Sequence, residues 1–223
     1  MPHHCPRRFL AAPFLMLLVV ALTLACASAG STQGKDSGRP APEFAGLTGW
    51  LNSGPLTMAG LREANRVVLV DFWTANCTNC RNTRPYVRAW HEKYADHGLT
   101  VVGIHTPEFE YEHDAATVRK TVESERIHFP VAQDNEYATW KAFQTRAWPT
   151  KYLVGADGNV QYVHIGEGDY AGAERAIRAA LTAAGYDLSA IPEGGSSAAA
   201  FSASPSRLAS GLLERLLSAG LAP

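Results

Sequence analysis

The sequence has few cysteines and no surplus of charge of either sign. Only four of its 223 residues are cysteine, and 20 Lys and Arg residues are balanced by 21 Asp and Glu residues. Balanced charge argues against the basic surface that nucleic-acid binding requires. Cys5 and Cys26 fall near the start of the chain, so only Cys77 and Cys80 remain for the rest. Two cysteines cannot build a framework of structural disulfides.

The sequence also lacks the ligands of a metal centre. Structural zinc usually takes four ligands, but no second CxxC motif or Cys/His pair accompanies Cys77 and Cys80. The histidines are scattered without a recognisable ligand spacing. We therefore expect neither a bound metal nor a cofactor.

An uncharged run follows two arginines near the start of the chain. Arg7 and Arg8 precede residues 9–27, which carry no charge, and a polar, Gly-rich segment comes next. This is the layout of an export signal. Three outcomes stay open: cleavage near Ala29, lipidation of Cys26 as in a bacterial lipoprotein, or retention as a membrane anchor. Each predicts an extracytoplasmic protein, in the periplasm or on the outer face of the cytoplasmic membrane, with no membrane contact beyond this segment.

The composition divides the chain into four parts. Residues 1–29 form the predicted export signal or anchor, and residues 30–42 are rich in Gly, Ser and Pro, as in a flexible linker. Residues 43–186 are long enough for one well-packed domain. Residues 187–223 form a low-complexity tail in which residues 207–217 are expected to make a short amphipathic helix.

The two cysteines follow an apolar, β-branched run. Residues 67–72 read as a strand buried on both faces, and the segment from Thr78 to about His97 reads as a helix. Free N–H groups and the helix dipole stabilise a thiolate at a helix N-terminus. We therefore expect the pKa of Cys77 to be lowered, which makes it the nucleophile, and Cys80 to face inward as the resolving thiol.

The rest of the domain alternates between strands and helices. The other predicted elements are a hairpin at residues 47–58, a connector at 59–62, strands at 99–104 and 129–132, helices at 114–126, 135–143 and 170–184, and a hairpin at 151–165. The second hairpin has the tight-turn pair Asp157-Gly158. This alternation predicts an α/β domain with parallel strands.

Several motifs of this domain resemble those of the thioredoxin superfamily. They are Val70-Asp71-Phe72-Trp73 ahead of Cys77-Thr78-Asn79-Cys80, then Pro85 and Trp148-Pro149. Together with His105-Thr106-Pro107-Glu108-Phe109, they are most similar to the exported TlpA- and ResA-like branch and to the thioredoxin domain of DipZ-type proteins. The resemblance implies a central mixed β-sheet flanked by helices, with an N-terminal hairpin and a helical insert.

The resemblance also implies roles for the residues around the cysteines. Cys77 would be the nucleophile, Cys80 the resolving thiol, and Asp71 the buried carboxylate that relays a proton. Burial independently predicts a raised pKa for Asp71, because the charged form is costly away from water. Arg81 and Arg84 are expected to act on the thiolate only modestly, as surface charges.

Four further residues are candidates for substrate contact or proton transfer. Pro149, if cis, would present the backbone of Trp148 to an extended substrate. Trp148 and Trp73 are expected to line the substrate site. Glu108 is a possible acid or base beside it.

The predicted function is that of an extracytoplasmic thiol–disulfide oxidoreductase acting on protein thiols and disulfides. By resemblance, its redox partner would be a membrane electron-transfer protein of the CcdA/DsbD type. Thr78-Asn79 matches neither reducing nor oxidising relatives, so the direction of electron flow stays open. The main alternative is a copper-binding chaperone of the same fold, since thiolates bind Cu(I). A peroxidase is suggested by Thr74 but opposed by Val70, where such enzymes carry proline.

Overall fold

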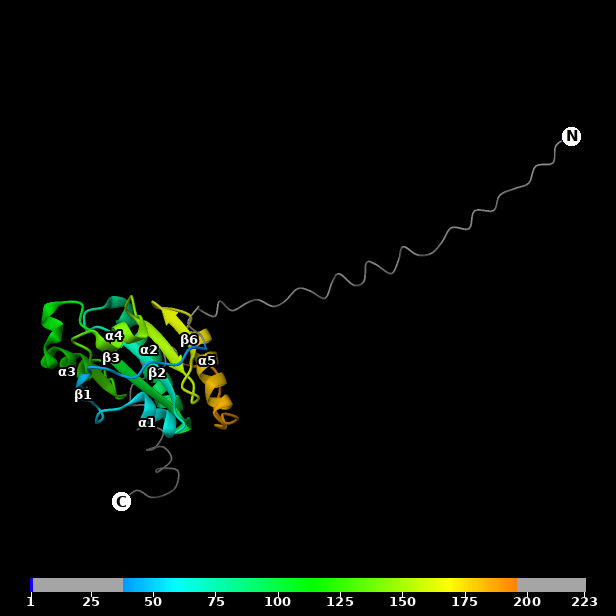
Figure 1. Ribbon diagram of the computed structural model, residues 1–223, viewed down its shortest axis with the longest axis horizontal. Coiled ribbons are helices and arrows are strands. Elements are labelled where there is room, and N and C mark those ends of the chain that lie inside the picture. Colours follow the sequence, from blue (N-terminus) through cyan, green and yellow to red (C-terminus); the bar gives the residue numbers. More distant parts are fainter. Residues whose placement is uncertain (2–37, 196–223) are drawn as a thin grey trace, which may run out of the picture. The chain divides into compact units, whose positions relative to one another are not determined.

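The computed structural model describes Met1 and residues 38–195, which contain a mixed six-stranded sheet (Figure 1). The strands are β1 (Thr48–Leu51), β2 (Val67–Trp73), β3 (Leu99–His105), β4 (Val131–Gln133), β5 (Thr150–Val154) and β6 (Val160–Ile165). Their order across the sheet is β1-β4-β3-β2-β5-β6. Strands β2, β3 and β4 run parallel, whereas β1, β5 and β6 pair with their neighbours in the antiparallel sense.

Helices cover both faces of this sheet. They are α1 (Met58–Glu63), α2 (Thr78–Tyr94), α3 (Ala115–Ser124), α4 (Ala138–Phe143) and α5 (Tyr170–Ala183), with short 3-10 helices η2 (Ala95–His97) and η3 (Glu110–His113). Helices α2, α3 and α5 pack with Leu69 and Trp73 of β2 in one core cluster. Helices α1 and α4 pack with Val68 and Phe72 in the other. Alternate side chains of β2 therefore point into opposite core clusters, and all seven of its residues are buried.

Most predicted elements are confirmed, with ends shifted by a few residues. The buried strand before the cysteines is β2, and the helix after them is α2, which contains Pro85. The Asp114 side chain caps α3 by accepting the N–H of Ala116 at 3.1 Å. Strands β5 and β6 form the expected hairpin, in which Gly158 adopts a φ of 84°.

The predicted hairpin at residues 47–58 is wrong. Strand β1 pairs with β4, and the chain begins helix α1 at Met58 instead of returning as a second strand. The Glu43 carboxylate accepts the N–H groups of Met58 at 2.6 Å and Ala59 at 3.0 Å, while the Thr57 hydroxyl accepts that of Gly60. These side chains satisfy the free N–H groups of a first helical turn, so a helix forms here.

The predicted export signal and the amphipathic helix at residues 207–217 lie outside the described residues. Between residues 38 and 195, no helix combines the length and the apolar character needed to cross a membrane.

Candidate active site

Several loops meet at one edge of the sheet. The parallel strands β2 and β3 both end there, at Trp73 and His105, which are paired in register. Strand β5 begins at the same edge with Thr150, and its partner β6 ends there with Ile165. The segments that carry the cysteines, Glu108 and Pro149 are therefore brought to one place by the strand directions.

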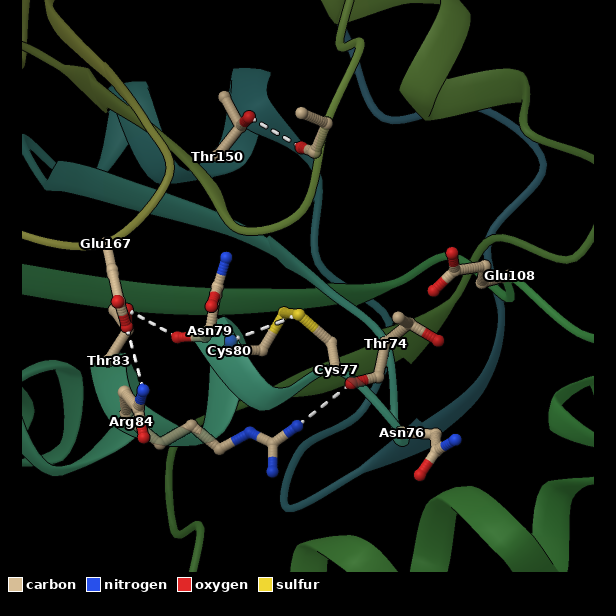
Figure 2. The surroundings of a disulfide bond; sticks show 12 residues. Thr74, Asn76, Cys77, Asn79, Cys80, Thr83, Arg84, Glu108, Thr150 and Glu167 are labelled. Atoms are coloured by element: carbon tan, nitrogen blue, oxygen red, sulfur yellow. Dashed lines mark hydrogen bonds between the residues drawn. A yellow bond between two sulfur atoms is a disulfide. The ribbon is translucent and has the colours of Figure 1, made fainter.

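Cys77 and Cys80 form a disulfide at the start of α2, with Cα atoms 5.2 Å apart (Figure 2). Cys77 is the N-cap residue, and its Sγ accepts the N–H of Cys80 at 3.1 Å. Cys77 is half-buried, whereas Cys80 is only 1% exposed. The N–H donor and the helix N-terminus favour a thiolate at Cys77, the more accessible of the two sulfurs.

A buried ion pair lies below α2, between Asp71 of β2 and Lys151 of β5. The two residues are opposite each other in register, and Lys151 Nζ lies 3.8 Å from Asp71 Oδ1. Burial raises the pKa of Asp71, and Lys151 and Arg84 oppose this by their positive charge. Burial likewise lowers the pKa of Lys151, against the pull of Asp71. The direction for Asp71 agrees with the expectation from sequence, but the lysine was not foreseen.

Arg84 is not the surface charge that the sequence suggested, because it is only 2% exposed. Figure 2 shows its side chain reaching from α2 to the Thr74 carbonyl, to which it donates at 3.0 Å. The guanidinium lies 4.6 Å from the centre of the Trp73 ring and forms an ion pair with Glu125. Its charge acts beneath the disulfide, where screening by water is weak.

Trp73 lies beneath the site and does not form its wall. Its side chain is 2% exposed, and its ring meets that of His105 edge-on, with centroids 4.9 Å apart. Burial is the main cause that lowers the pKa of His105 to about 4, so this imidazole is neutral near pH 7. Direct substrate contact by Trp73 would require the core to open.

Glu112 of η3 is a buried carboxylate that the sequence did not single out. It accepts hydrogen bonds from the Thr74 hydroxyl at 2.6 Å and the Asn76 N–H at 2.8 Å. It also accepts the N–H groups of Glu108 at 2.7 Å and Phe109 at 3.1 Å. Burial alone would raise the pKa of Glu112, but these hydrogen bonds stabilise the carboxylate more strongly, so its pKa is lowered. This carboxylate holds the segment before Cys77 against the segment after β3.

Glu108 itself is exposed, and its backbone rather than its carboxylate makes the contact with Glu112. Its side chain lies among the surroundings of the disulfide in Figure 2. Nothing in this geometry tests the predicted acid or base role, which stays a prediction.

The Trp148-Pro149 peptide bond is cis, as the resemblance implied. The Pro149 carbonyl accepts the N–H of Gly166 at 2.7 Å, which joins this loop to the one after β6. Trp148 is half-buried, and its ring centre lies 4.5 Å from that of Trp140. Trp148 thus packs against the domain at the edge of the site, and contact of Trp148 or Pro149 with a substrate stays a prediction.

Among residues 38–195, no group of three or more His, Cys, Asp or Glu side chains is placed to hold a metal ion. The chemistry that this arrangement can perform is exchange at the Cys77–Cys80 pair, with ionisable groups below it.

The chain is similar in sequence to several known proteins. The chain is 42% identical over 144 residues to protein DipZ of Mycobacterium bovis and of Mycobacterium tuberculosis, which covers 63% of this chain but 20% of DipZ. It therefore spans about a fifth of the length of these relatives. It is 30% identical over 128 residues to the thiol-disulfide oxidoreductase YkuV of Bacillus subtilis, covering 57% of this chain and 84% of YkuV.

Solved structures extend the likeness to the fold. A Chlorobium tepidum protein described as a thiol:disulfide interchange protein DsbE aligns with a TM-score of 0.58 at 28% identity, over 66% of this chain and 98% of that one. The family model described as the AhpC/TSA family matches residues 37–163. The chain thus has a thioredoxin-like fold and belongs to the AhpC/TSA family.

Proposed function

We propose that this protein is an extracytoplasmic thiol–disulfide oxidoreductase that exchanges disulfides with protein substrates. The observation that carries the proposal is the Cys77–Cys80 pair at the start of α2, with one sulfur half-buried and the other enclosed. Relatives named thiol-disulfide oxidoreductases, among them YkuV, support it.

The proposed reaction has two exchange steps. In the reduced protein the Cys77 thiolate attacks a substrate disulfide, forms a bond to one of its sulfurs and releases the other as a thiolate. Cys80 then loses its proton to Asp71 and attacks the Cys77 sulfur. This forms the Cys77–Cys80 disulfide and releases the second substrate thiol, so two electrons pass to the substrate. The same steps in reverse would oxidise a dithiol.

Asp71 suits the second step because of its position and charge. Asp71 lies two residues from both Leu69 and Trp73 along β2, so its side chain is on the same face as theirs, the face that α2 covers. Its raised pKa makes the carboxylate a better proton acceptor near neutral pH than an exposed aspartate.

The proposed substrate is an extended polypeptide that pairs with the backbone of Trp148 beside Pro149. A membrane protein of the CcdA/DsbD type is the proposed electron partner. Residues 1–29, with an uncharged run after two arginines, support export and attachment to the membrane.

Substitution of the cysteines tests the mechanism. In an insulin reduction assay, Cys77→Ser should abolish turnover and Cys80→Ser should accumulate a mixed disulfide with the substrate. Ser124→Ala, at an exposed position at the end of α3, is the control for substitution as such and should keep full activity. Turnover that survives in Cys77→Ser would contradict the proposal.

The location is tested separately by accessibility in intact cells. A membrane-impermeant thiol reagent should label Cys77 of the reduced protein without lysis. Incorporation of a labelled fatty acid that is lost in Cys26→Ser would show that Cys26 carries a lipid. Labelling only after lysis would contradict an extracytoplasmic site.

The reduction potential decides the direction of electron flow. A value near −270 mV indicates a reductant, and one near −120 mV an oxidant.

A peroxidase is not favoured, because the Thr74 hydroxyl donates its hydrogen bond to the Glu112 carboxylate, at 2.6 Å. Consumption of hydrogen peroxide faster than reduction of disulfides would reverse this conclusion.

A further inference from the structure

Exposed apolar side chains gather at the edge of the sheet that carries the disulfide. Between residues 38 and 195, the large hydrophobic side chains that are exposed are Phe109 at 45%, Tyr111 at 53% and Ile165 at 60%. Phe109 and Tyr111 follow the end of β3, and Ile165 ends β6 opposite Thr150, next to Pro149. Exposed apolar groups on both sides of a reactive disulfide indicate a surface for binding a partner.

The two aromatic residues are held in place beside the nucleophile. Their rings are stacked, with centroids 5.8 Å apart and planes 4° from parallel. The N–H of Phe109 is bound by the buried Glu112 carboxylate, which also binds the N–H of Asn76, the residue before Cys77. The Phe109 backbone and the two stacked rings are therefore held in a defined position near Cys77.

Acidic residues alternate with these aromatics. Residues 108–111 read Glu-Phe-Glu-Tyr, and all four are exposed; we call them the acidic–aromatic loop. Glu167 is exposed as well, and Figure 2 places it and Glu108 on opposite sides of the disulfide. Arg81, on α2, is exposed too, so the excess of negative charge belongs to the loop rather than to the whole edge.

We infer that the acidic–aromatic loop recognises polypeptide substrates whose disulfide is flanked by apolar and basic residues. The inference rests on the proposed function and names its substrate class. The Phe109 and Tyr111 rings offer apolar contact and a face for Lys or Arg, and the Glu108 and Glu110 carboxylates pair with the same cations. An anionic membrane surface does not fit this loop, because these carboxylates would be repelled by it.

Two disulfide-bonded peptides that differ only in the residues beside the cysteines test the inference, one with Leu and Lys and the other with Leu and Glu. We expect the wild-type chain to reduce the lysine peptide with a kcat/KM about fivefold higher, as a pair of exposed charge contacts allows. Glu108→Lys/Glu110→Lys should reverse the preference. Phe109→Ala/Tyr111→Ala should lower kcat/KM about tenfold for both peptides.

The control for net charge is Glu63→Lys/Glu123→Lys, which makes the same change at exposed positions of α1 and α3. It should keep the wild-type preference. Reduction of bis(2-hydroxyethyl) disulfide, which has no flanking residues, should be the same in the wild type, in Phe109→Ala/Tyr111→Ala and in Glu63→Lys/Glu123→Lys. Equal rates on both peptides, or a preference that changes as much in the control as in the loop variant, would overturn the inference. Failure of the wild type to reduce any of these disulfides would instead overturn the proposed function.

Discussion

At the scale of single residues, Asp71 and Lys151 form a pair in which each charge depends on the other. Both side chains are almost fully enclosed, at 2% and 1% exposure. A buried charge without its partner is strongly destabilising, whereas replacing both charges together is much less so. The pair is thus a good subject for a double-mutant cycle.

We expect Asp71→Asn and Lys151→Met each to lower the free energy of unfolding by about 3 kcal/mol, because each leaves a buried polar group unpaired. The double variant Asp71→Asn/Lys151→Met should lose clearly less than the sum. Chemical denaturation of the four proteins measures this, and simple additivity would show that the two residues do not interact.

Lys151→Met should also change the pH dependence of the second exchange step. Lys151 opposes the rise in the pKa of Asp71, so its removal should move that pKa further up. The rate of product release should then reach its plateau at a higher pH than in the wild type, and Asp71→Asn should remove this limb of the profile. An unchanged profile in both variants would argue against proton transfer to Asp71. Single-turnover kinetics between pH 5 and 9 measures the profile.

Glu112 offers a second prediction at this scale. Glu112→Gln replaces one carboxylate oxygen by an amide NH₂, which cannot accept a hydrogen bond. At least one of the N–H and O–H groups that now bind the carboxylate therefore loses its acceptor. This should cost about 2 kcal/mol of stability and speed the alkylation of Cys77 in the reduced protein, because the loss of a nearby negative charge favours the thiolate. Glu110→Gln, an exposed neighbour in the same 3-10 helix, is the control and should change neither quantity. Equal effects in the two variants would contradict the role given to Glu112.

At the scale of the elements, helix α1 depends on side chains that precede it. Thr57 provides the N-cap, and Glu43 reaches the first N–H groups from fifteen residues earlier in the chain. Thr57→Ala should lower the free energy of unfolding by about 1 kcal/mol, while Thr57→Ser keeps the hydroxyl and should cost little. Disulfide exchange should be unaffected, because α1 precedes the opposite end of β2. Thermal unfolding and the insulin assay check the two statements, and equal stability of both variants would contradict the capping role.

Helix α1 also marks where inference from the sequence stops. Strand β2, helix α2 and the hairpin of β5 and β6 were predictable, because a continuous apolar run, a helical apolar face and an Asp-Gly turn are local signals. The hydrogen bonds that Glu43 accepts from the first turn of α1 are not a local signal, because Glu43 lies fifteen residues before Met58. The pairing of Asp71 with Lys151 depends on the register of two strands, although a charged residue inside each of two apolar strands was a signal that could have been followed. Glu112 gave no such signal, because nothing in the sequence distinguishes it from Glu108 and Glu110, which precede it at alternate positions.

At the scale of the whole domain, the enclosed His105 makes stability depend on pH. Its pKa is about 4 in the folded protein and about 6.5 in an unfolded chain. As pH falls through this interval, the unfolded chain takes up a proton that the folded protein does not, so the free energy of unfolding falls. The difference in pKa corresponds to about 3 kcal/mol, fully lost only below about pH 4.

His105→Phe should remove this loss, because the ring still packs against Trp73 but no longer binds a proton. Urea denaturation at a series of pH values from 7 to 4 measures the slope. His164→Phe, on β6 beside Tyr162, is the control for a His-to-Phe exchange and should keep the slope of the wild type. A slope that is the same in His105→Phe and the wild type would mean that other groups cause the acid sensitivity.

The Glu112 carboxylate has a mechanical consequence for the domain. It binds N–H groups from the segment before Cys77 and from the acidic–aromatic loop at the same time. A polypeptide that pushes this loop aside must either stretch these hydrogen bonds or carry Asn76 along with the loop. The acidic–aromatic loop and the segment that ends at Cys77 are therefore joined through one side chain, and a displacement of the first would be transmitted to the second.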